Sequence, residues 1–167
     1  METITHLFRF SLQVLTLDKR PSEYPSQIKY TYLALVIAFL SEIALGLISG
    51  YNFYVLATTI VSFSWIDVFL VFLNMEYRFK QSVGTFLGVS VIGNTIACIL
   101  FIFLESESVT PLMISLLFKI IVMHRLHRFA FRLKRSTLTI STIIYVIFIT
   151  VTFFGLVSLH SAHYFNK

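Results

Sequence analysis

The sequence is poor in charge and in cysteine. Only 13% of its 167 residues are Asp, Glu, Lys or Arg, against roughly 25% in an average soluble domain, which excludes a water-soluble globular class. The single cysteine, Cys98, lies inside an apolar run and excludes a disulfide framework, a CxxC pair and a thiolate metal site. What remains is 57% hydrophobic, with 18 Phe and a mean hydropathy of +0.84. This composition is typical of a polytopic membrane protein.

Catalytic motifs are also missing. The sequence contains no HExxH, no GxSxG, no P-loop and no Rossmann glycine pattern. Its Ser and Thr residues lie in apolar runs without a His or Lys base at a recognisable spacing. We therefore expect no enzyme, no cofactor and no metal. Since neither an internal repeat nor a low-complexity linker divides the chain, a single helical bundle is expected.

Long apolar runs predict the membrane spans. About 20 apolar residues in a helix suffice to cross a hydrocarbon core of roughly 30 Å. The turn-prone residues 49–52 separate the first two runs, and Pro111 stands where the first turn of a helix tolerates proline. The sequence thus predicts an all-α, polytopic membrane protein, in which residues 30–167 form a five-helix transmembrane bundle. Its spans are expected at about 30–48, 53–74, 83–104, 109–127 and 137–159.

The basic residues predict the orientation. Eleven of the thirteen Lys and Arg residues fall within 9–29, 78–80 and 125–135. The fourth span is short and is interrupted by Lys119, but if it crosses, all three basic segments lie on one side. The far side then receives the acids Glu105 and Glu107 and a single cation, Lys167. By the positive-inside rule, the N-terminus is expected in the cytoplasm and the C-terminus outside.

Residues 1–29 predict an amphipathic helix followed by a proline-containing linker. Apolar side chains gather on one side of the helical wheel, at Ile4, Leu7, Phe8, Val14 and Leu15. This pattern favours a helix that lies in the membrane interface. A helix packed on the bundle is the alternative. Pro21 and Pro25 then break the chain before the first span.

Three ionisable residues fall at membrane depth: Glu42, Asp67 and Lys119. Each costs about 2.5 to 3.5 kcal/mol if it faces lipid at the centre of a helix, so we expect them to face protein, water or each other. Lys119 lies between the two acids in depth, and either can reach it if the helices adjoin. Two interpretations stay open: a buried ion pair that fixes helix register, and a proton or cation site.

Small residues mark the third span. Gly84 and Gly88 have small-xxx-small spacing, and Gly93 and Asn94 continue the line. Such spacing permits close approach of another helix, either within the bundle or in a homodimer. Asn94, near the midplane, is expected to bond another helix, with Thr or Ser residues of the last span as one option.

A basic patch follows the fourth span, at Arg125, Arg128, Arg132, Lys134 and Arg135. The spacing predicts a segment along the cytoplasmic interface whose arginines meet anionic lipid headgroups. Docking of an acidic partner protein is the alternative, and no nucleic-acid binding is expected. His124 and His127 share a helix face, but further ligands are missing and the flanking arginines oppose a bound metal cation.

The chain resembles the Yip1-domain superfamily, in particular small bacterial membrane proteins that carry only this domain. The similar features are Pro21-Ser22-Glu23-Tyr24-Pro25-Ser26 before the first span, Arg78-Phe79-Lys80-Gln81 at the third, and His127-Arg128-Phe129-Ala130 between the last two. The resemblance implies a five-helix bundle with a cytoplasmic N-terminus, and action through other membrane proteins or lipids.

Two function hypotheses follow. The first is a non-catalytic accessory or scaffold subunit of a bacterial inner membrane, with membrane lipid and a membrane-protein partner or homodimer as its contacts. The second is a small transporter or ion pathway that uses Glu42, Asp67 and Lys119. A phage or plasmid membrane effector is a third hypothesis, which gene neighbourhood would distinguish.

Overall fold

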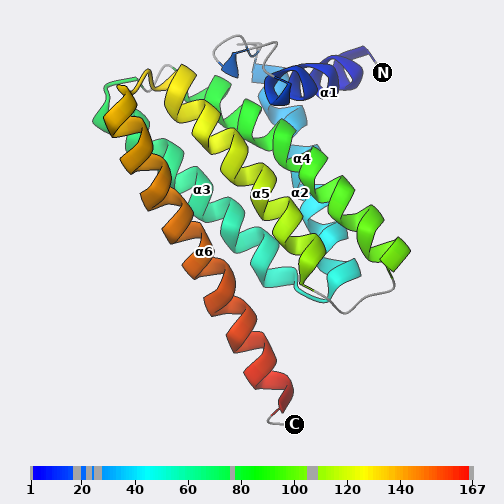
Figure 1. The fold of residues 1–167 in the computed structure, drawn as a ribbon. Helices are drawn as coiled ribbons and strands as arrows, with labels where there is room; N and C mark the ends of the chain where they lie inside the picture. The colour runs from blue at the N-terminus through cyan, green and yellow to red at the C-terminus, as the bar shows by residue number, and fades with distance from the viewer. Residues whose placement is uncertain are drawn as a thin grey trace.

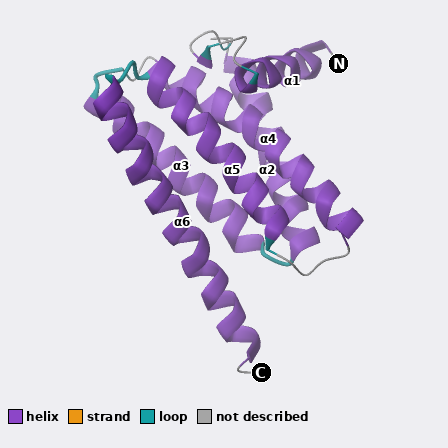
Figure 2. Ribbon diagram, in the orientation of Figure 1, coloured by secondary structure: helices purple, strands orange, loops and turns teal. Residues whose placement is uncertain are grey.

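The computed structural model shows an α-helical bundle (Figure 1). It describes residues 2–16, 20–21, 24, 28–75, 78–104 and 109–165. Short loops link the helices, and the described residues contain no strand (Figure 2). The α-helices are α1 (Glu2–Leu15), α2 (Ile28–Ser49), α3 (Asn52–Phe72), α4 (Phe79–Leu104), α5 (Thr110–Arg125) and α6 (Arg135–Phe165), with a π-helical turn η3 (Leu126–Ala130) after α5.

The helix boundaries follow the turn residues. α2 ends at Ser49, and Gly50 has a φ of 73°, a left-handed conformation that glycine adopts without a Cβ clash. The chain therefore reverses directly into α3. Pro111 lies in the first turn of α5, where its missing N–H leaves no helical hydrogen bond unmade. Both features were predicted from the sequence and are confirmed.

Helices α2 to α6 run alongside one another and successive helices alternate in direction, while α1 crosses the end of the bundle where α2 begins (Figure 1). α4 is the central helix and contacts α1, α2, α3 and α5. α6 packs on α3, α5 and η3, and its C-terminal part extends beyond the other helices (Figure 1). The alternation brings Lys29, Arg78, Lys80 and the 125–135 segment to one end.

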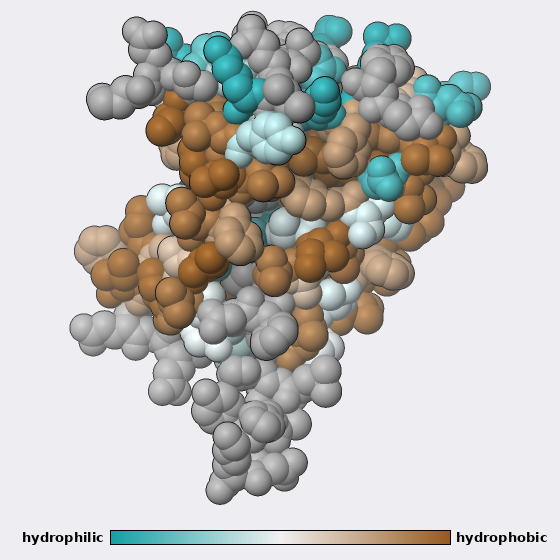
Figure 3. All heavy atoms as spheres, turned by 180° about the vertical axis from the view of Figure 1, so that it is seen from behind, coloured by the Kyte–Doolittle hydropathy of each residue, from teal (hydrophilic) through white to brown (hydrophobic). Residues whose placement is uncertain are grey.

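The bundle exposes many large apolar side chains and buries several polar and charged ones inside a largely apolar core. Large apolar side chains are exposed along α2, α3 and α6, whereas Glu42, Asn94 and Lys119 are buried. On the face seen in Figure 3, a broad apolar band covers the bundle and hydrophilic residues gather at the end near α1. Lipid is the solvent that this distribution suits.

Three helices are long and apolar enough to cross a membrane: 29–49 in α2, 79–103 in α4 and 135–158 in α6. The membrane class predicted from the sequence is thus supported. The apolar part of α3, Leu56–Phe72, and the 16-residue α5 are shorter. The predicted boundaries lie within four residues of the helix ends, except that α6 continues to Phe165, six residues beyond the predicted end. The last two residues of the fourth predicted span belong to η3. Lys19, Glu105, Glu107 and Lys167 lie outside the described residues.

α1 packs on the bundle differently from the predicted wheel. Leu7, Phe10 and Val14 are buried, and they form part of the core with α4. Ile4 and Phe8, which the wheel placed on the same side as Leu7, are 47% and 43% exposed. α1 thus has two apolar faces, because one packs on the bundle and the other faces outward.

Candidate functional site: a buried charge pair shared by the helices

An ion pair lies in the interior of the bundle. The Nζ atom of Lys119 on α5 is 3.2 Å from Oε1 of Glu42 on α2, and the two side chains are 1% and 5% exposed. Lys119 lies nine residues into α5, about 14 Å from its start. Both charges are almost fully buried, so each depends on the other for neutralisation.

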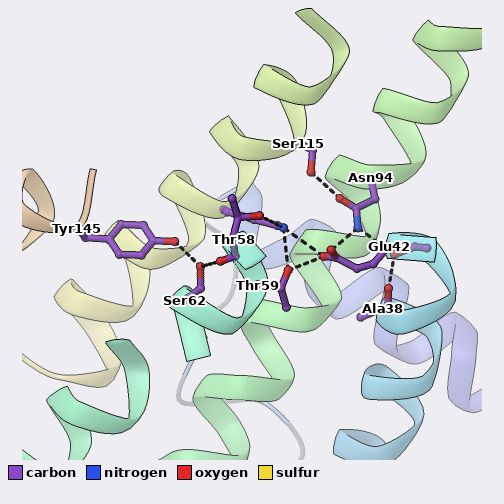
Figure 4. Close-up of polar contacts among 10 residues, drawn as sticks. Ala38, Glu42, Thr58, Thr59, Ser62, Asn94, Ser115 and Tyr145 are labelled. Carbon is purple, nitrogen blue, oxygen red and sulfur yellow. Dashed lines mark hydrogen bonds and ion pairs between the residues drawn. The ribbon is translucent and has the colours of Figure 1, made fainter. Parts of the chain in front are cut away.

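Two threonines of α3 accept hydrogen bonds from Lys119. Its ammonium donates to Oγ1 of Thr58 at 2.9 Å and to Oγ1 of Thr59 at 2.8 Å. Thr59 in turn donates to Oε1 of Glu42 at 2.6 Å (Figure 4). Thr59 therefore bridges the two charges, and α3 is tied to both α2 and α5.

α4 joins the network through Asn94. Its Nδ2 donates to Oγ of Ser41 at 3.1 Å and to Oε1 of Glu42 at 3.3 Å, while its Oδ1 accepts from Ser115 of α5 at 2.5 Å (Figure 4). The prediction that Asn94 bonds another helix is confirmed, but the partners lie on α2 and α5 and not on the last span.

A second branch reaches α6. Ser62, one turn after Thr58, donates to the Thr58 carbonyl at 2.7 Å and lies 2.8 Å from the hydroxyl of Tyr145. All five helices of the bundle thus contribute to one polar cluster, which comprises Ser41, Glu42, Thr58, Thr59, Ser62, Asn94, Ser115, Lys119 and Tyr145. We call these nine residues the central cluster.

Two spaces border the central cluster. A small pocket of about 10 Å³ lies beside Lys119, Thr58 and Ser115, and it has room for about one water molecule. A groove of about 300 Å³ lies on the outward side of Glu42. Its other lining residues are apolar: Phe39, Ile43, Leu47 and Leu56. Oε2 of Glu42 is buried and has no hydrogen-bond partner within the described residues.

Asp67 does not belong to the central cluster. It is exposed on the outward face of α3, so of the three predicted surroundings (protein, water or another charge) the bundle interior and Lys119 do not apply. Depth alone does not say which side of a helix a residue occupies. Eight residues, about 12 Å along the helix, separate Asp67 from Thr59.

The small residues of α4 are covered by this chain's own side chains. A Cβ atom at Gly84 would overlap the ring of Tyr24, and one at Gly88 would overlap Oγ of Ser11 in α1. A Cβ at Gly93 would lie 2.7 Å from Cβ of Phe118 in α5. This face therefore packs within one chain. Burial, and then the neighbouring Tyr30, raise the pKa of Tyr24 above its ordinary value, so that its hydroxyl stays a donor to the Tyr30 carbonyl.

The basic patch is not one continuous helix. Arg132 has a φ of 53°, and residues 131–134 separate η3 from α6. Arg128, Arg132, Lys134 and Arg135 are exposed, as predicted. Arg125 is only 5% exposed, so its predicted contact with lipid phosphate is wrong. Its guanidinium lies 4.9 Å from the centre of the Phe129 ring, on which Arg128 also stacks at 5.0 Å.

A histidine holds the C-terminal half of α3 in place. Nε1 of Trp65 donates to Nε2 of the fully buried His127 at 2.9 Å. His127 and His124 both lie within hydrogen-bond distance of Oγ1 of Thr142 on α6, at 3.3 and 3.2 Å. These bonds lock η3 between α3 and α6.

Sequence reasoning missed Thr58, Thr59, Ser62 and Trp65. The signal was present as the Thr-Thr-x-x-Ser spacing in an apolar run, because hydroxyls inside a span tend to bond neighbouring helices. Comparison with known proteins gives no match to a family model, a curated protein or a solved structure. The Yip1-domain resemblance stays a prediction.

Proposed function

We propose that the chain is a non-catalytic integral membrane protein that acts as an accessory or scaffold subunit, through contacts with another membrane protein or with lipid. The observation that carries this proposal is the buried ion pair of the central cluster. The charges of Glu42 and Lys119 are used to join α2, α3, α4 and α5. The pocket beside Lys119 has room for about one water molecule, and the groove beside Glu42 is otherwise lined by apolar residues. A transport site would need water or substrate to reach these charges.

In this proposal α2 to α6 all cross the bilayer. The 21 residues of α3 extend about 31 Å, enough to cross. α5 alone extends about 24 Å, and η3 continues it. Since α5 packs along the buried α4, the two helices are expected to share the same medium.

The charge distribution supports a cytoplasmic N-terminus. Lys29, Lys80, Arg128 and Arg135 are exposed at the end of the bundle that α1 crosses. By the positive-inside rule this end faces the cytoplasm, and in a bacterium the membrane is the inner one. The C-terminus then lies outside, because five crossings reverse the side.

α1 would rest in the cytoplasmic interface. Ile4 and Phe8 border a crevice with Ala34 and Ile37 of α2, so the exposed apolar face of α1 points along the outer surface of the bundle. Acyl chains would cover this face, while Arg128, Arg132, Lys134 and Arg135 meet anionic headgroups.

Ion or proton transport is the second candidate, because the buried Oε2 of Glu42 lacks a hydrogen-bond partner in the described part of the chain. The two functions give different results for Glu42→Gln. A scaffold requires that this variant loses stability, that neither protein conducts protons in liposomes, and that the wild-type chain copurifies with a defined partner in mild detergent. Proton flux in wild type that disappears in a folded Glu42→Gln variant would establish transport. Recovery of the wild type solely as a free monomer after crosslinking would contradict the scaffold function.

A further inference from the structure

The outward face of α3 combines apolar residues with two polar ones. Leu56, Ile60 and Val71 are 40%, 55% and 53% exposed, and Ser64 and Asp67 are exposed between them. Positions 56, 60, 64, 67 and 71 recur at helical spacing and form one stripe. We call these five residues the α3 stripe.

Asp67 has no hydrogen bond or ion pair within the described residues, and α3 cannot rotate to give it one. Ile66 and Leu70, which lie beside Asp67 on the side of α3 that turns into the bundle, are fully buried. The bond from Trp65 to His127 fixes the same turn of the helix. The carboxylate is therefore held on the outside of the bundle.

Water is also out of reach on the proposed topology. Asp67 lies five residues before the end of α3, about 8 Å from its cytoplasmic end. Side chains in a helix tilt toward its N-terminus, which for α3 is the outer side, so the carboxylate points away from the nearer surface. The short Asp side chain cannot snorkel back as Lys or Arg does.

The groove beside Glu42 makes part of this surface concave. Leu56 belongs both to the α3 stripe and to the groove lining. It lies 11 residues, three helical turns or about 17 Å, from Asp67. A charge and a concave apolar surface are therefore aligned along one side of α3.

We infer that the α3 stripe docks a transmembrane helix of another protein, which carries a Lys or Arg at the depth of Asp67. About three turns toward the outer side, a bulky apolar side chain of that helix fills the groove. This inference rests on the proposed function, whose partner it specifies. A cation is required because a carboxylate in lipid needs neutralisation, and partners of intramembrane charges are opposite charges.

A second copy of this chain does not supply that cation. All copies share one orientation, and the exposed Lys and Arg residues that the structure describes lie at the cytoplasmic end of the bundle or in α1. Lys119 lies deeper, but it is buried in its own ion pair. The partner is therefore a different protein.

The test is site-specific photocrosslinking of the full chain in the membranes of the cells that make it. A photoreactive amino acid is placed at Ile60 or Val71 of the α3 stripe, and at Ile147 of α6 as a matched exposed control. The adduct is digested, and mass spectrometry identifies the attached segment. Asp67→Asn is compared with Thr95→Val, a change at an exposed polar residue of α4 that lies outside the α3 stripe. Thermal unfolding is the measure of folding.

We expect an adduct with a membrane-spanning segment that contains Lys or Arg. Its yield should fall by roughly fivefold or more in Asp67→Asn, because a desolvated charge pair has lost one partner, and stay unchanged in Thr95→Val. Asp67→Lys combined with the partner's cation changed to Asp should restore it. Self-adducts, lipid adducts alone, a partner span without a cation, or a yield independent of Asp67 would overturn the inference. A protein adduct confined to Ile147 would leave the accessory function standing. The absence of protein adducts at every position, together with recovery of the wild type solely as a free monomer after crosslinking, would contradict both.

Discussion

Oε1 of Glu42 accepts hydrogen bonds from Thr59 and Asn94 and also faces the Lys119 ammonium, so one oxygen atom joins three other helices to α2. The opposite charges lie 3.2 Å apart, and both side chains are almost fully buried. The pair therefore fixes the relative depth of α2 and α5. Loss of either charge should therefore lower the free energy of unfolding, and loss of both together should lower it less than the two single losses added.

Replacing Glu42 by Gln should destabilise the protein by about 3 to 5 kcal/mol, because the Lys119 ammonium is left buried without a counter-charge. Lys119→Met should cost a similar amount. The double variant Glu42→Gln, Lys119→Met should recover much of the loss, since no buried charge remains. Thermal unfolding in one detergent measures all three. Additive losses in the double variant would show that the two charges do not act as a pair.

Thr59→Val should cost about 1 to 3 kcal/mol, because the variant keeps the shape but leaves donors and acceptors of the central cluster unsatisfied. Thr95→Val on α4 is the matched control, since Thr95 is exposed and bonds only the carbonyl of Val91 in its own helix. The control should unfold within about 0.5 kcal/mol of wild type. Equal effects of the two variants would remove Thr59 from the proposed bridging role.

Gly93→Ala should destabilise the bundle by about 1 to 3 kcal/mol, because the new methyl group meets Cβ of Phe118, which cannot move without α5. Gly155→Ala is the control, since nothing lies within 4 Å of its Cβ position. There the higher helix propensity of alanine should be neutral or stabilising by up to about 1 kcal/mol. A reversal of this order would contradict the packing of α4 against α5.

Cysteine labelling should separate the ends of the chain. In a Cys98→Ser background, cysteines at Arg9 and Lys134 should react with a membrane-impermeant reagent only from the cytoplasmic side. A cysteine at position 167 should react only from the outside, because five crossings lie between. Labelling of positions 9 and 167 from the same compartment would contradict five spans.

Changing Arg128, Arg132, Lys134 and Arg135 together to Gln should weaken binding of anionic lipid by about 1 kcal/mol for each cation removed, with little change in thermal stability. Native mass spectrometry with an anionic and a zwitterionic lipid measures this difference. Arg125→Gln serves as the contrast, since Arg125 is buried against Phe129 and should affect stability more than lipid binding.

The helices were predictable because apolar runs and turn residues are local features. The segment 49–52 and Pro111 mark boundaries that the structure reproduces. The contact between Lys119 and an acid was also predictable, since depth follows from counting residues. The choice of Glu42 over Asp67 was not, because α3 is apolar all round and hydropathy does not reveal its buried side.

Contacts between distant segments were hidden from the sequence for the same reason. Nothing near Gly84 indicates that Tyr24 covers it, and the helical spacing of Arg125 and Arg128 does not announce the turn η3 between them. The role of the α3 threonines could have been predicted from the sequence. Two adjacent hydroxyl residues one turn before a serine are unusual on a surface that faces lipid. The sequence thus indicated the chemistry of single residues, but not the side of the helix on which each one lies.

The short α5 with its central ammonium has a consequence for biosynthesis. On its own it is a poor substrate for membrane insertion, because it is brief and carries a cation at its middle. Glu42 and the α3 threonines precede Lys119 in the chain, so they are synthesised first. On the proposed five-span topology they are already in the bilayer when α5 leaves the ribosome. On that topology, α5 would therefore insert with the help of the helices made before it, and loss of Glu42 should lower the efficiency of that insertion.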